Sequence, residues 1–183
     1  MAIVSGGNRR KPAKSRRAGE GPGRGGRPQK GAEGNLSAAV FFKSGTPGLA
    51  RELSPLLKKA VLAAASGKKA GGVLNLVVVS DTEIKRLNKA FLSHAGATDV
   101  IAFNHARPAF SPPGETAPFG DIYICLPAAR RQAAKMGHSL ETELLILAVH
   151  GALHLSGMDD ATAAQRLKMN KKTVRLLREL SYS

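Results

Sequence analysis

The chain has 183 residues, a formal net charge of +15, 4% aromatic residues and no tryptophan. This length suits one domain with a hydrophobic core plus a tail, and the charge indicates an acidic partner such as nucleic acid, although solubility alone would also account for it. The single cysteine, Cys125, excludes an internal disulfide and a CxxC metal knuckle, which fits a reducing cytoplasm.

Residues 1–34 differ in composition from the rest of the chain. They hold nine Lys and Arg against two acidic residues, and nine of the 20 glycines. Such a segment cannot bury enough apolar surface to offset its ordering entropy, so we expect it to be disordered. A basic arm suits contact with phosphates, but a solvated tail without a function is an equal alternative. The chain has neither a secretory signal nor an apolar run of the roughly 18 residues that span a membrane, so we expect a soluble, cytoplasmic protein.

The first elements after this segment are a strand, a helix and a second strand. Leu36 to Phe42 is a candidate edge strand. Thr46 and Pro47 provide an N-cap and a first-turn proline for a helix whose apolar residues recur at helical spacing as far as Gly67. The valine-rich run from Val73 to Val79 predicts a buried strand.

The middle of the chain predicts a helix and two further strands. Ser80 and Glu83 form a candidate capping box at the start of the helix. Thr98 to Phe103 and Gly120 to Cys125 predict two strands that pair with each other, joined by a proline-rich loop over residues 105–118.

Three helices complete the expected fold, a mixed α/β or α+β domain in which helices flank a small sheet. Pro127 opens the first of them, which ends near Gly137, and Ser139 caps the longest apolar helix, Leu140 to Leu155. A last helix is expected over about residues 161–180. Its inward side chains are expected to be Leu167, Val174 and Leu177, and its outer face to carry Arg166, Lys168, Lys171, Lys172, Arg175 and Arg178.

The stretch HGALHLSGMDD carries the clearest chemical signal. His150 and His154 are four residues apart, so both imidazoles lie on one face of the apolar helix. After a glycine that can reverse the chain, Asp159 or Asp160 could return to complete a site of the kind that holds catalytic zinc. Two alternatives stay open, namely that the histidines are core residues and that Asp160 is the N-cap of the last helix.

This stretch resembles the HGxLHLxGxDH signature of the YbeY family of rRNA maturation endoribonucleases. LNKAFLSHAGATDVIAF (residues 87–103) is similar to the family's helix and PTDVLSF segment, and FGDIYIC (residues 119–125) to its GDI-I strand. The similarity covers roughly residues 49–180. It implies an α+β fold, a single domain with a small mixed sheet of about four strands flanked by helices. The chain would then divide into a disordered basic tail, 1–34, and a YbeY-like RNase domain, 35–183.

The resemblance also implies a function. The family cleaves single-stranded RNA in rRNA 3′-end maturation and ribosome quality control, with one divalent metal ion, expected to be Zn²⁺, on three histidines. Carried over by position, the metal ligands are His150, His154 and Asp160, whereas no residue is identified as the general base. The implied partners are single-stranded RNA, rRNA and ribosomal particles, with no membrane and no small-molecule cofactor.

Several positions depart from the family pattern. Asp160 stands in place of the third histidine, so water on the metal should be less acidified and harder metals better tolerated. Leu92 stands in place of an arginine that would bind phosphate near the metal, and the candidates to replace it by proximity in sequence are His94, His105 and Arg107. Ala97 and Ala102 replace a proline and a serine of the family segment.

These departures leave alternatives to a metal-dependent endoribonuclease. One is a catalytically impaired RNA- or ribosome-binding assembly factor that has lost the arginine and changed a ligand. Another is a metallopeptidase-like hydrolase, but its HExxH motif needs a glutamate where this chain has Gly151. Asp99 and Asp121 either support the metal ligands or act as structural partners of turns.

Overall fold

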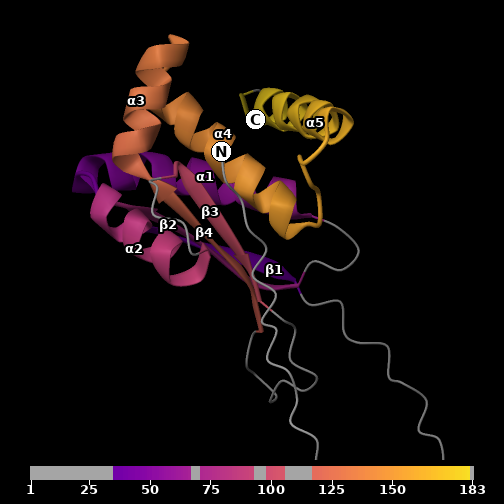
Figure 1. Cartoon of the computed structure of the whole chain (residues 1–183), viewed down its shortest axis with the longest axis horizontal. Helices are drawn as coiled ribbons and strands as arrows, with labels where there is room; N and C mark the ends of the chain where they lie inside the picture. Colours follow the sequence, from indigo (N-terminus) through magenta and orange to yellow (C-terminus); the bar gives the residue numbers. More distant parts are fainter. Residues whose placement is uncertain (1–34, 67–70, 93–97, 106–116, 182–183) are drawn as a thin grey trace, which may run out of the picture.

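A four-stranded mixed sheet forms the centre of the computed structural model, which describes residues 35–66, 71–92, 98–105 and 117–181 (Figure 1). The strand order is β1-β2-β4-β3; β1, β2 and β4 are parallel, and β3 is antiparallel to β4. The predicted α+β fold with a four-stranded sheet and flanking helices is therefore confirmed. The elements are β1 (Leu36–Phe42), α1 (Pro47–Ala65), β2 (Gly72–Val79), α2 (Asp81–Leu92), β3 (Val100–Asn104), β4 (Pro118–Cys125), α3 (Leu126–Met136), α4 (Leu140–Leu155) and α5 (Ala163–Ser181).

Different helices cover the two faces of the sheet (Figure 1). Helices α1 and α4 pack on one face, with α5 against both of them, while α2 lies on the other face. Because side chains alternate along a strand, β2 and β4 contribute to both layers. Leu76 and Ile122 face α1 and α4 in the larger core, whereas Val77 and Cys125 join Ile84 of α2 in the smaller core.

The predicted helix caps set the starts of three helices and the end of another. Each cap hydroxyl accepts a hydrogen bond from a backbone N–H that has no partner within its helix. Gly137, with φ of 73°, ends α3 in the left-handed conformation that glycine adopts at low cost. The cap hydroxyls belong to Thr46, which accepts from Leu49 N at 3.3 Å, Ser80, from Glu83 N at 3.2 Å, and Ser139, from Thr142 N at 3.1 Å.

The inward face predicted for the last helix is wrong. Leu167 is 56% exposed and Val174 is 49% exposed, although Leu177 does pack against the core. The helix has apolar residues on more than one side, and packing against α1 and α4 buries the side that runs from Met169 to Leu180. The buried residues are Met169, Thr173, Leu176 and Leu180. The predicted outer cations are exposed or, for Lys172, half-buried.

Some predictions fall outside the described residues. These are the disorder of residues 1–34, most of the loop over 105–118, and the candidates His94 and Arg107. Within the described part, none of the helices is both long enough and apolar enough to span a membrane.

Candidate metal centre

Helix α4 holds both histidines of HGALHLSGMDD tightly against the sheet. Gly151 lies between them, and a Cβ at this position would be 2.9 Å from Cγ2 of Ile122 on β4. Gly120 on β4 meets the same helix, since a Cβ there would be 2.8 Å from Cδ2 of Leu155. The two glycines therefore allow the end of α4 to approach β4 closely. Position 151 faces the sheet, so a side chain there could not act as the base of an HExxH peptidase.

Gly151→Ala is expected to destabilise the protein by about 1–3 kcal/mol, the usual cost of overpacking a core. The buried Ile122 side chain leaves no room for the added methyl group, so α4 must move away from β4. Chemical unfolding of the variant and the wild type would measure this loss. Equal stability would mean that the contact between α4 and β4 relaxes without cost and does not fix the histidines.

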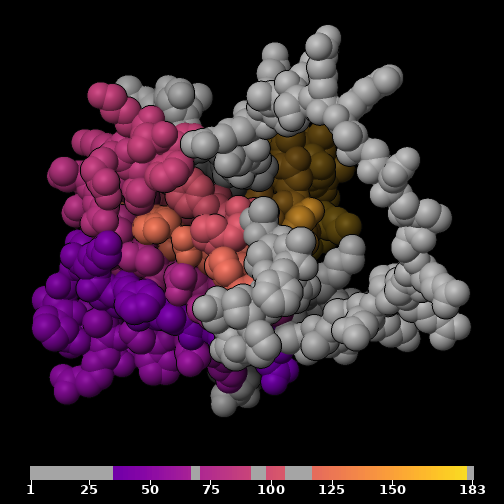
Figure 2. All heavy atoms as spheres, turned by 90° about the horizontal axis from the view of Figure 1, so that it is seen from below, coloured from indigo at the N-terminus to yellow at the C-terminus, as the bar shows by residue number. Residues whose placement is uncertain are grey.

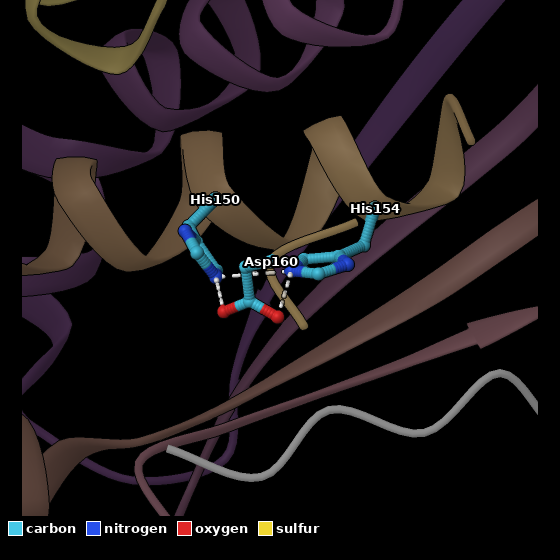
Figure 3. A group of neighbouring side chains, drawn as sticks. All are labelled: His150, His154 and Asp160. Atoms are coloured by element: carbon cyan, nitrogen blue, oxygen red, sulfur yellow. Dashed lines mark hydrogen bonds and ion pairs between the residues drawn. The ribbon is translucent and has the colours of Figure 1, made fainter. Parts of the chain in front are cut away.

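His150, His154 and Asp160 converge at the end of α4 (Figure 3). The two Nε2 atoms are 3.0 Å apart. Oδ2 of Asp160 is 3.7 Å from Nε2 of His150, and its Oδ1 is 4.0 Å from Nε2 of His154. Gly157, with φ of 85°, lets the chain reverse after the helix and bring the carboxylate back to the histidines. The structure thus brings together the three residues that the sequence predicted as ligands.

The alternative that Asp160 is the N-cap of the last helix is wrong. Thr162 Oγ1 accepts from Gln165 N at 3.2 Å, and Gln165 Oε1 accepts from Thr162 N at 2.8 Å, which is a complete capping box at the start of α5. Arg166 instead donates to the backbone oxygen of Asp160 at 3.0 Å, and Asp159 Oδ1 accepts from Asp160 N at 2.8 Å. These bonds hold the backbone of Asp160 and leave its carboxylate directed at the histidines.

The environment keeps both imidazoles neutral. Burial, with a smaller contribution from nearby His154, lowers the pKa of His150 to about 4, although the charges of Asp160 and Asp99 oppose the shift. Burial also lowers the pKa of His154, again against the charge of Asp160. Neutral imidazole is the form that binds metal ions. Two imidazole nitrogens and one carboxylate, all within 4.8 Å of one another, therefore fit the donor set of a divalent transition metal.

Comparison with known proteins places this donor group in a family. The model described as Endoribonuclease YbeY matches residues 45–181, which include all three side chains. The chain belongs to the YbeY family. Endoribonuclease YbeY of Elusimicrobium minutum is 45% identical over 140 residues, covering 75% of this chain and 95% of that protein. The protein of the same name from Moorella thermoacetica is 39% identical over 133 residues, covering 69% and 85%.

A solved structure supports the same fold. The solution structure of TM1509 from Thermotoga maritima matches with a TM-score of 0.54 and 25% identity, covering 78% of this chain and 88% of that one. Together with the family model, it confirms the similarity to the YbeY family that the motifs indicated.

In this YbeY family member, His154 borders a small cavity that the sequence did not predict. The cavity has a volume of about 310 Å³ and lies beside His154. Asn104 on β3 also lines the cavity and carries an amide. It lies two residues after Ala102, so the two side chains point to the same face of the sheet, and this alternation was visible in the sequence. The lining residues are Ala102, Asn104, His154, Leu155, Gly157, Met158 and Asp159.

Among the described residues, His105 and Asp121 lie away from the metal centre. His105 Nε2 is 2.9 Å from Asp121 Oδ2, and Asp121 Oδ1 accepts from Asn75 Nδ2 at 2.9 Å. Asp121 alternates with Gly120 and Ile122, which contact α4, so this group lies on the opposite face of the sheet. His105 therefore does not replace the family arginine.

Two other positions named from the sequence, Asp99 and Leu92, lie at the ends of secondary-structure elements. Asp99 Oδ1 accepts from Val100 N at 2.9 Å and from Thr98 Oγ1 at 3.3 Å, so its carboxylate is a structural partner at the start of β3, and its charge also raises the pKa of His150. Leu92, at the position of the family arginine, is the last residue of α2.

A buried acid on α4 was not predicted from the sequence. Glu143 lies seven residues before His150, on the same side of the helix, and is 1% exposed. Its Oε2 is 3.1 Å from Nε2 of His138. Burial raises the pKa of the Glu143 carboxyl, His138 opposes the rise, and the charge of Asp99 adds to it. The sequence could have indicated this buried acid, because Glu143 is the one charged residue on the apolar side of the predicted helix.

Glu143→Gln is expected to gain stability over the wild type as the pH rises above 4.5, the ordinary pKa of the carboxyl. A carboxyl whose pKa is raised by folding contributes stability below its unfolded pKa and loses it as the pH rises through its folded pKa. Glutamine does not titrate, so we expect the stability of the variant relative to the wild type to increase from that pH up to the raised pKa of the carboxyl. Urea unfolding at several pH values would measure it, and parallel pH profiles would contradict it.

Proposed function

We propose that this YbeY family member is a metal-dependent endoribonuclease that cleaves single-stranded RNA, with rRNA 3′-end maturation as its role. The observation that carries the proposal is the convergence of two neutral imidazoles and a carboxylate at the end of α4. This group lies within the region shared with proteins named Endoribonuclease YbeY. We propose Zn²⁺ as the resident ion, and cytoplasmic ribosomal particles as the place of action.

Each residue of the centre has a distinct part in this proposal. Buried His150 would present Nε2 from a fixed position on α4, and His154 would present Nε2 at the edge of the cavity. Asp160 would add one negative charge and close the donor set from the other side. A divalent ion held there would supply a Lewis acid for the scissile phosphate and lower the pKa of a water molecule. The Asn104 amide is placed to donate or accept a hydrogen bond to a nucleotide in the cavity.

The size of the cavity favours a single strand as the substrate. Its volume of about 310 Å³ is at the lower end of the roughly 300–1,000 Å³ of small-molecule sites. A cavity of this size suits one nucleotide that is free to leave its neighbours, rather than a base pair held in a duplex. RNA-binding proteins read unpaired nucleotides in this splayed form.

The experiment that tests the proposal combines metal analysis with an RNA cleavage assay. The purified protein should contain about one metal ion per chain, and a labelled single-stranded RNA should be cleaved until a chelator is added. Cleavage at full rate in chelator would refute a metal-dependent mechanism. Bound metal and bound RNA without cleavage would favour the alternative, an assembly factor, which the leucine at position 92 supports.

We propose that residues 1–34 form a separate basic tail that contacts RNA, with 35–183 as the RNase domain. Deletion of 1–34 is expected to leave thermal unfolding unchanged, because the described core lies wholly after this segment. Removal of the cations of the tail should also make RNA binding less dependent on salt. The slope of log Kd against log salt should fall by about 0.7 for each phosphate that the tail neutralises. An unchanged slope in a titration of both proteins would contradict this role.

A further inference from the structure

A basic hollow on α5 adjoins the cavity of the metal centre. The hollow has a volume of about 480 Å³ and is lined by Met158, Lys168, Lys171, Lys172 and Arg175. Met158 also lines the cavity beside His154, so the two spaces share part of their wall. A chain molecule that leaves the metal centre past Met158 would therefore enter the basic hollow directly.

The charge of this hollow is largely uncompensated. Among the described residues, no carboxylate lies within 4.0 Å of the amino groups of Lys168, Lys171 or Lys172. Arg175 pairs with Glu179 at 3.2 Å, but both side chains are well exposed, and such pairs contribute little. The four cations occupy positions i, i+3, i+4 and i+7, which follow one side of the helix over two turns. They form a short cationic track rather than scattered surface charge.

We propose that this basic hollow binds the phosphates of the RNA strand next to the bond cleaved at the metal centre. The inference rests on the proposed function and adds to it the path of the substrate. Lysine ammonium groups on flexible stems bind phosphates without reading sequence, so the hollow would hold a strand in position irrespective of its bases. Sequence preference would then have to come from elsewhere.

An anionic membrane surface is the competing partner for such a helix. The exposed Leu167 and Val174 lie beside the cations, as in helices that lie on membranes. However, α5 has no phenylalanine or tryptophan to enter the lipid boundary, and its cations line a hollow rather than a flat face. The position of this hollow next to the cavity of the metal centre, with Met158 in the wall of both, favours a strand of RNA.

The test compares two matched double variants of the full chain. Lys168→Gln with Lys172→Gln removes two cations of the hollow, and Lys85→Gln with Lys89→Gln removes two exposed cations with the same spacing on α2. Helices α2 and α5 lie on opposite sides of the molecule, as Figure 2 and Figure 1 both show. Binding of a labelled single-stranded oligonucleotide is measured by fluorescence anisotropy in chelator, so that cleavage does not enter the result.

The α5 pair is expected to weaken binding several-fold and to lower the slope of log Kd against log salt by about 1.4, or about 0.7 for each phosphate neutralised. The α2 pair should bind like the wild type. Equal losses in both pairs would overturn the proposal, because the binding would then follow net charge alone. Wild-type binding to phosphatidylserine vesicles without binding to the oligonucleotide would overturn it in favour of a membrane. If only the α5 pair loses RNA binding and the wild-type protein does not cleave RNA, the result would support the hollow as an RNA-binding site and reject the proposed nuclease function.

Discussion

His154→Ala is expected to abolish stoichiometric metal binding and to lower the rate of RNA cleavage by more than about 100-fold, since loss of a group that merely supports a ligand already costs about 10–100-fold. The variant keeps only Nε2 of His150 and the carboxylate of Asp160, which are 3.7 Å apart. Two donors leave the ion bound mainly by water. Metal content by mass spectrometry and a single-turnover cleavage assay would measure both losses.

The matched control is His105→Ala, which removes a half-exposed imidazole that pairs with Asp121 on the opposite face of the sheet. It should retain metal and cleavage. The His154 variant should also fold, because its side chain is neutral in the folded protein and lies at the edge of a cavity. Retention of one metal ion per chain in His154→Ala would reject the ligand assignment, and loss of metal in His105→Ala would place the ion elsewhere.

The local part of this centre could be predicted from the sequence. The four-residue spacing of His150 and His154 within an apolar run fixes their common face, because helix geometry alone determines it. The same is true of the helix caps at Thr46 and Ser139, which depend on residues three positions apart. The role of Asp160 was open because an aspartate before a helix is a good N-cap. The competing signal, Thr162 followed three residues later by Gln165, was present in the sequence and settles the cap.

Contacts between distant segments could not be predicted in this way. The absence of a base at Gly151 was visible in the sequence, but its cause, the approach of α4 to Ile122 of β4, depends on the sheet order. The inward stripe of α5 likewise depends on which side α1 and α4 present to it. Asn104 joined the cavity only because β3 pairs with β4 beneath the end of α4. Each of these features needs the three-dimensional arrangement as well as the local pattern.

Asp160→His is expected to shift the preference of the centre toward zinc and away from manganese. Imidazole is a softer ligand than carboxylate, and the change removes one negative charge from a site that already holds two histidines. Asp160→Asn should instead weaken binding of every divalent metal by at least about 10-fold, because the amide oxygen carries no charge. Its stability should stay near that of the wild type, since Thr162 and not Asp160 caps α5. Competition titrations with Zn²⁺ and Mn²⁺, together with thermal unfolding of the metal-free proteins, would measure both effects.

Asp159→Asn is the comparison for these variants, because Asp159 is adjacent in sequence and lines the cavity, but its Oδ1 accepts the backbone N–H of Asp160 and it is not part of the group of three donors. If Asp160→Asn keeps its metal affinity while Asp159→Asn loses it, the third ligand is the neighbouring carboxylate and the turn after Gly157 rearranges on binding. If Asp160→His binds zinc less tightly than the wild type, the backbone at this position cannot direct a longer side chain at the two imidazoles. The distance from the turn to α4 would then be too short for a histidine side chain. The aspartate at position 160, in place of the family histidine, would follow from the path of the chain rather than from a preference for another metal.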